Sequence, residues 1–146
     1  MVLIRSVPLK ADTILIYVRH IVSFLVGIGF IYIGVDHFLD PNWFKPIVPN
    51  IIGFPMFWVL LSGLCEVILG FLLILPKSRR LAALGLVLLL IVLYSANLNM
   101  WINNIALDGI YLSHTWHTVR AVIQILLIFI ALWLGEFIPF TRGKKR

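Results

Sequence analysis

The chain has 146 residues, of which 62% are hydrophobic and only 12% are charged, and its mean hydropathy is +1.06. A soluble domain is about half apolar and about a quarter charged, and a disordered chain has few apolar residues and many charges, so the composition excludes both. The net charge of +6 fits basic residues that flank membrane spans better than nucleic-acid binding, because no basic face alternates with exposed aromatic residues. We therefore expect one transmembrane domain over residues 1–146, with the lipid bilayer and not nucleic acid as its partner.

Four long stretches almost free of charge predict four transmembrane helices, because a helix needs about 20 residues to cross the hydrocarbon. Prolines and glycines mark the breaks between these stretches. The predicted helices cover residues 14–37, 55–75, 80–99 and 116–137. The two longer loops cover residues 38–54 and 100–115. The short link between the second and third helices makes them antiparallel neighbours. The predicted fold is all-α, an integral membrane four-helix bundle.

The first predicted helix carries His20, Ser23, Gly27 and Gly34 on or near one stripe. Small residues on one face of a membrane helix are typical of close packing against another helix. We therefore expect this stripe to face a neighbouring helix.

Glu66 is the only charged residue in the stretch 46–76. It lies roughly 16 Å from either end of its helix, near the bilayer midplane. A carboxylate there costs at least a few kcal/mol unless it is protonated, paired or hydrated. Ser62, Glu66 and Gly70 share one helix face, and small neighbours let another helix come close. We expect Glu66 to point into the bundle.

The fourth predicted helix offers partners for this carboxyl group. His117, Arg120 and Gln124 have the spacing i, i+3, i+7 and form one stripe. Gln124 lies at a depth close to that of Glu66, so we expect Glu66 to contact Arg120 or Gln124. Such a contact is either a structural clamp between helices or part of a ligand or proton site.

Further polar residues lie near the helix ends on the side of the two longer loops. The candidate polar cluster or ligand site comprises Glu66, Arg120, Gln124, His117, Asn97, Asn99, His37 and Asp36. His114 and His117 are spaced to share a metal ion, but a zinc site needs three or four ligands and nothing in the sequence fixes a third. We expect ordinary interfacial histidines and no metal.

The twelve Lys and Arg residues divide unevenly between the two ends of the predicted bundle. With four spans, both termini lie on the same side as the short link. That side holds Arg5, Lys10, Arg19, Lys77, Arg79, Arg80, Arg142, Lys144, Lys145 and Arg146. The other side holds only Lys45 and Arg120. Because cytoplasmic segments carry the excess of Lys and Arg, we expect both termini in the cytoplasm and the two longer loops outside.

Short motifs spread over residues 19–100 together resemble a known family. They are His37-Phe38-Leu39-Asp40-Pro41, Ile47-Val48-Pro49, Ser62-Gly63 with Glu66 and Gly70, Arg79-Arg80-Leu81-Ala82-Ala83, and Ala96-Asn97-Leu98-Asn99-Met100. The set is similar to the DoxX-like family of small four-helix bacterial membrane proteins. The resemblance implies a small bacterial inner-membrane protein and leaves its function open. One branch of the family is named for a subunit of thiosulfate:quinone oxidoreductase, and other members are linked to thiol-oxidative stress, quinone or catechol resistance, or membrane chaperone roles. The single cysteine, Cys65, argues against disulfide exchange by this chain alone.

Three functions remain open. The first is a redox- or stress-associated subunit that binds a quinone or another lipophilic small molecule in an outer-facing polar pocket, with chemistry supplied by a membrane or redox partner protein. The second is a structural or chaperone-like assembly protein without a ligand. The third is a small proton-coupled transporter, which requires a homo-oligomer such as a dimer. We expect no catalytic residues and no enzymatic activity of the chain itself, since no nucleophile elbow, phosphate loop, zinc-protease or dinucleotide motif occurs.

Overall fold

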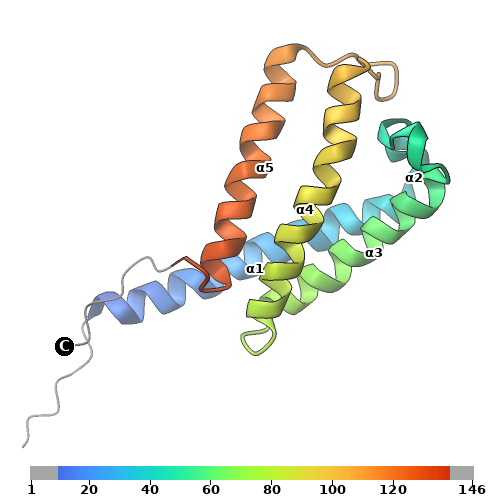
Figure 1. The fold of residues 1–146 in the computed structure, drawn as a ribbon. Helices are drawn as coiled ribbons and strands as arrows, with labels where there is room; N and C mark the ends of the chain where they lie inside the picture. The colour runs from blue at the N-terminus through green and yellow to red at the C-terminus, as the bar shows by residue number, and fades with distance from the viewer. Residues whose placement is uncertain (1–9, 139–146) are drawn as a thin grey trace, which may run out of the picture.

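Four long helices dominate the computed structural model, which describes residues 10–138 (Figure 1). They are α1 (Lys10–Leu39), α3 (Pro55–Ile74), α4 (Arg79–Ile102) and α5 (His114–Leu134). Each contains a stretch long and apolar enough to cross a membrane. The described residues contain no β-strand. The predicted all-α membrane bundle is therefore confirmed.

The helix ends differ from the predicted ones by a few residues. Short helices that the sequence did not predict occupy the first loop, and they are α2 (Pro41–Phe44), η1 (Lys45–Ile47) and η2 (Asn50–Ile52). Proline at the first position of a helix loses no hydrogen bond and presets φ, which explains why a proline-rich loop is helical here. α5 ends at Leu134 and not at 137, because the chain turns at Gly135 and reaches φ 60° at Glu136.

Helices α1 and α3 are antiparallel and make the most extensive contact of any two elements in the described chain. Gly27 faces Gly70, and Gly34 faces Gly63. A Cβ atom built on any of these four glycines would lie within 2.5–2.7 Å of an atom of the facing helix. The small stripe of the first helix therefore packs as expected, and its partner is the glycine face of the helix that carries Glu66.

Helices α4 and α5 form a second antiparallel pair, inclined to the first (Figure 1). At the end of α5, Arg19 of α1 forms an ion pair with Glu136 and lies over the ring of Trp133, at 5.7 Å from its centroid. From there α1 and α5 diverge along their length (Figure 1).

Two apolar cores lie at different levels of the bundle. The larger core joins all four long helices and comprises Phe30, Leu73, Ala82, Ala83, Leu86, Val87, Leu90, Ala131 and Leu134. The smaller core packs the loops at the other end and comprises Ile47, Met100 and Leu107. Leu90 and Met100 lie roughly 15 Å apart along α4, and the predicted polar residues fall in the layer between them.

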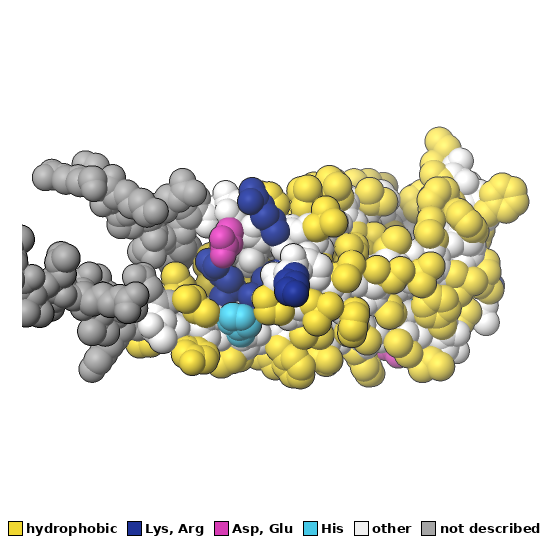
Figure 2. Space-filling view, turned by 90° about the horizontal axis from the view of Figure 1, so that it is seen from below, with side chains coloured by type: hydrophobic (Ala, Val, Ile, Leu, Met, Phe, Trp, Pro, Cys, Tyr) yellow, Lys and Arg dark blue, Asp and Glu magenta, His cyan; other side chains and the backbone are white. Residues whose placement is uncertain are grey.

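Most of the described Lys and Arg residues gather at one end of the molecule, which we call the basic end (Figure 2), whereas Lys45 of η1 and Arg120 of α5 lie away from it. It carries Arg19, Lys77, Arg79 and Arg80. Arg79 is buried and donates its Nε hydrogen to the carbonyl oxygen of Leu73 at 3.2 Å, which satisfies a free carbonyl at the end of α3. Arg5, Arg142, Lys144, Lys145 and Arg146 lie outside the described residues. We call the opposite end, with α2 and the α4–α5 loop, the loop end.

Candidate functional site

The buried carboxyl group of Glu66 faces the imidazole of His37 across the α1–α3 contact. Glu66 Oε2 lies 2.9 Å from His37 Nδ1, and the two residues are only 4% and 6% exposed. Their angles depart from regular hydrogen-bond geometry, and neither atom has another hydrogen-bond partner among the described residues. The pair is therefore the main compensation for a carboxyl group in the middle of a membrane span.

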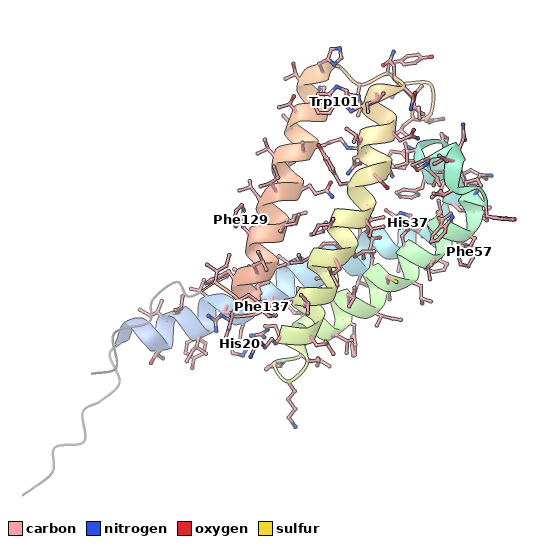
Figure 3. All side chains as sticks on the ribbon, in the orientation of Figure 1. His20, His37, Phe57, Trp101, Phe129 and Phe137 are labelled. Carbon is pink, nitrogen blue, oxygen red and sulfur yellow. The ribbon has the colours of Figure 1, made fainter. Side chains whose placement is uncertain are left out.

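Antiparallel geometry explains why these two side chains meet. A long side chain leans toward the N-terminus of its own helix. Because α1 and α3 run in opposite directions, His37 and Glu66 lean toward each other, and they meet level with Gly34 and Gly63. The ring of His37 also packs on Phe44 of α2, with the ring centroids 3.9 Å apart. Figure 3 shows His37 at the loop end of α1, far from His20 at the basic end.

Arg120 and Gln124 of α5, the expected partners of Glu66, form hydrogen bonds with α4 instead. Arg120 Nη2 donates to Asn97 Oδ1, and Asn97 Nδ2 donates to Gln124 Oε1 at 2.7 Å. Gln124 Nε2 donates to the carbonyl oxygen of Leu90. This network joins α4 to α5. The predicted contact of Glu66 with Arg120 or Gln124 is therefore not formed, and Glu66 pairs with His37 between α1 and α3.

Both groups of polar residues line one cavity of about 420 Å³ between the two helix pairs. Its polar lining residues are His37, Glu66, Asn97, Arg120 and Gln124. Ligand pockets in proteins typically have volumes of about 300–1,000 Å³ and are mostly apolar with a few placed polar groups. The structure therefore gathers five of the eight predicted site residues around a space of ligand size.

Apolar residues of α1 and α5 form one side of this polar cavity, and apolar residues of α2, η1 and α4 complete its lining. Ile33 of α1 and Ile123 of α5 line it and are 46% and 50% exposed. Gly29 of α1 also lines it, and a Cβ atom built there would meet nothing within 4 Å. Because α1 and α5 diverge here, the polar cavity opens sideways between them. In a bilayer this opening faces lipid, whereas the smaller core packs over its loop end.

The other three predicted site residues lie outside the polar cavity. His117 is buried, and its ring stacks on Trp101 with the centroids 5.5 Å apart and the planes at 8°. Asn99 Nδ2 donates to the carbonyl oxygen of Ile47 at 2.9 Å, which ties α4 to η1. Asp36 is half-buried near the end of α1. Trp101 Nε1 also donates to His114 Nδ1 at 3.0 Å. No group of three or more possible metal ligands occurs among the described residues.

Sequence reasoning missed the role of His37 as the partner of Glu66. A signal was present in the glycines, because Gly27 and Gly34 have the same seven-residue spacing as Gly63 and Gly70. Pairing these two sets in antiparallel order fixes the register of α1 against α3. With the lean of the side chains, that register brings His37 to Glu66.

The fold defines a multi-pass membrane protein with four helices long and apolar enough to span a bilayer, and the polar cavity lies between its two helix pairs. The family described as "Domain of unknown function (DUF8561)" matches residues 26–135, and the chain belongs to this family. The matched segment contains every residue that lines the polar cavity. No curated protein and no solved structure matches the chain.

Proposed function

We propose that this protein binds a lipophilic small molecule with a quinone-like head group in the polar cavity, as a redox- or stress-associated membrane subunit. The observation that carries the proposal is the polar cavity itself. It places a guanidinium, two amides and a carboxyl–imidazole pair around about 420 Å³ within the membrane layer. Intramembrane ionisable residues that face a cavity are characteristic of functional sites. The DoxX-like motifs of the sequence support the same proposal.

The chemistry of the lining fits ring carbonyl oxygens. Arg120 carries five N–H donors, and its side-chain hydrogen bonds within the described residues go to Asn97 Oδ1 and the Met100 sulfur. Its remaining donors suit an acceptor such as a quinone oxygen. Across the polar cavity, Glu66 and His37 can give or take a proton when the ring oxygen changes its charge. Electrons for any redox step come, in this proposal, from a partner protein.

The sideways opening fits a ligand that dissolves in the bilayer. A lipophilic ring reaches the polar cavity between α1 and α5 without passing through water. This differs from the outer-facing pocket that the sequence predicted, since the smaller core of Ile47, Met100 and Leu107 packs over the loop end.

We expect Gly29→Phe to abolish quinone binding without unfolding the protein. The new ring has free space at the opening, because a Cβ atom at Gly29 meets no neighbour, and it fills the route into the polar cavity. Leu25→Phe, one turn away on the lipid-facing side and 62% exposed, is the matched control. The measurement is equilibrium binding of a short-chain benzoquinone to the purified protein, with quinone extracted from the membrane-purified protein as a second readout. Equal binding by both variants would refute a site in this cavity.

Glu66→Gln tests the head-group contact in the same assay. We expect weaker quinone binding, by about tenfold, if the carboxyl–imidazole pair contacts the ring oxygen, which corresponds to about 1.4 kcal/mol. The structural alternative is favoured by one observation, the network that ties Asn97 and Gln124 to the Leu90 carbonyl across α4 and α5. In that alternative, Glu66→Gln leaves quinone content unchanged and only thermal stability falls.

We further propose that the basic end faces the cytoplasm of a bacterial inner membrane. The support is the excess of Lys and Arg at this end. We expect a cysteine at Ser113, in a Cys65→Ala background, to be labelled by an impermeant maleimide added outside intact cells. A cysteine at the exposed Lys77 of the α3–α4 turn is expected to be labelled only after the membrane is permeabilised. Labelling of position 77 from outside would reverse the orientation.

A further inference from the structure

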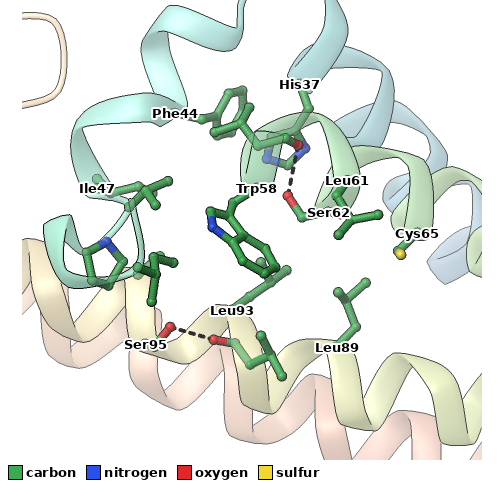
Figure 4. A pocket seen from close by; sticks show the side chains of 16 residues that line it. His37, Phe44, Ile47, Trp58, Leu61, Ser62, Cys65, Leu89, Leu93 and Ser95 are labelled. Carbon is green, nitrogen blue, oxygen red and sulfur yellow. Dashed lines mark hydrogen bonds between the residues drawn. The ribbon is translucent and has the colours of Figure 1, made fainter. Parts of the chain in front are cut away.

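A second and smaller cavity lies beside the first, between α3, α4 and the short helices of the first loop (Figure 4). Its volume is about 180 Å³, and it is open on one side, because its lining residues Trp58 and Val92 are 40% and 65% exposed. We call it the apolar chamber. Trp58, Leu61 and Cys65 of α3 and Leu89 of α4 lie on its wall.

The wall of the apolar chamber offers a ligand almost no polar groups. Ser62 Oγ donates to the carbonyl oxygen of Val59 at 2.9 Å, and Ser95 Oγ donates to that of Val92 at 2.8 Å. Both hydroxyl groups are therefore used within their own helices, as the dashed lines in Figure 4 show. His37 Nδ1 is engaged with Glu66. The apolar chamber therefore suits a hydrocarbon group as its occupant.

The apolar chamber and the polar cavity share a wall. The residues that line both are His37, Phe44, Ile47, Leu93 and Ala96. One molecule with a polar ring on the Glu66 side of His37 and a hydrocarbon chain on the Trp58 side would contact both spaces. The two cavities are therefore one layer of side chains apart, which is close enough for the two ends of one amphiphile.

We propose that the apolar chamber holds the hydrocarbon tail of the ligand whose head group occupies the polar cavity. This inference rests on the proposed function and narrows its ligand class to quinones that carry a chain. Lipid tails are as apolar as the lining, so transfer from the bilayer supplies little hydrophobic free energy. The chamber selects the tail by close packing and by the high local concentration that attachment to a bound head group gives.

The experiment is photo-crosslinking of the wild-type protein with a benzoquinone that carries a decyl chain ending in a diazirine. Mass spectrometry of the digested protein locates the attached chain. We expect attachment at Leu61, Cys65 or Leu89, and we expect an excess of tail-less benzoquinone to suppress it. Attachment at Ile33, Ile123 or Leu127 would show that the tail leaves through the opening to the lipid, and would overturn the proposal.

A decanoic acid with the same terminal diazirine is the control for the head group. If it labels the apolar chamber as strongly as the quinone probe, and tail-less benzoquinone does not compete, the occupant is an ordinary lipid chain and the proposal fails. If tail-less benzoquinone shows no equilibrium binding to the protein, both the proposed function and the tail assignment fail. Tail-less binding combined with attachment elsewhere rejects only the tail assignment.

A filling variant gives a second readout. Cys65→Phe places a ring in the apolar chamber, and Cys65 does not line the polar cavity. We expect the ratio of decyl-quinone affinity to tail-less affinity to fall by about fivefold, or about 1 kcal/mol. Leu64→Phe, on the neighbouring lipid-facing position and 48% exposed, should leave this ratio unchanged. An unchanged ratio in a folded Cys65→Phe protein contradicts the proposal.

Discussion

Replacing Glu66 by leucine is expected to lower the free energy of unfolding by about 3 kcal/mol. The change removes the carboxyl group that lies 2.9 Å from His37 Nδ1. It leaves the imidazole, only 6% exposed, without a polar partner among the described residues. Unfolding of the purified protein by sodium dodecyl sulfate, followed by circular dichroism, measures the loss. A protein as stable as the wild type would show that Glu66 is not held in this buried pair.

A double-mutant cycle identifies the partner of Glu66. Replacing both Glu66 and His37 by leucine removes the unpaired group as well as the pair, so the double variant should be less destabilised than the sum of the single variants. We expect a coupling free energy of at least about 1 kcal/mol, which is large for polar contacts between membrane helices. The matching cycle of Glu66 with Arg120 should give a smaller coupling, because Arg120 is bound to Asn97. The opposite order of the two couplings would favour the pairing expected from the sequence.

Replacing Gly63 by alanine is expected to destabilise the protein by about 2–3 kcal/mol, the cost of inserting a methyl group into a closely packed contact. The new Cβ atom would lie 2.5 Å from the Cβ atom of His37 and 2.8 Å from the carbonyl oxygen of Gly34. Neither neighbour is the end of a flexible side chain, so α1 and α3 must move apart. The same unfolding assay measures the change.

Gly29→Ala is the matched control for that prediction. Gly29 belongs to the same helix as Gly34, but its Cβ position is open. Alanine has the higher helix propensity, so this variant should be more stable than the wild type by about 0.5–1 kcal/mol. If both alanine variants shift stability in the same direction, the backbone contact between α1 and α3 is not the cause.

The predictions for Glu66 and Gly63 concern the same contact, the packing of α1 against α3. The glycine contact sets the distance between α1 and α3, and His37 is packed against Gly63 while it faces Glu66. Separation of the two helices therefore also separates the carboxyl group from the imidazole. For this reason Gly63→Ala should weaken quinone binding as well as lower stability, whereas Gly29→Ala should not lower stability.

Much of the fold follows from the sequence alone. The uncharged stretches predicted the four long helices, because length and hydropathy decide whether a segment can cross a bilayer and neither depends on its neighbours. Glu66 was predicted to point into the bundle on the face that it shares with Ser62 and Gly70, and Glu66 and Gly70 are indeed buried. Helical periodicity determines such faces locally.

The partners within the site were decided only by the tertiary structure. Periodicity places Glu66 on an inward face, but it does not say which helix that face meets or at what register. The close approach of glycines on α1 and α3 sets the register that brings Glu66 to His37. Asn97 forms hydrogen bonds with Arg120 and Gln124, the two residues that the sequence had assigned to Glu66. The inclination between the two helix pairs then opened the polar cavity toward α1 and α5. Each of these depends on contacts between residues far apart in the chain, which the spacing of residues along one helix does not encode.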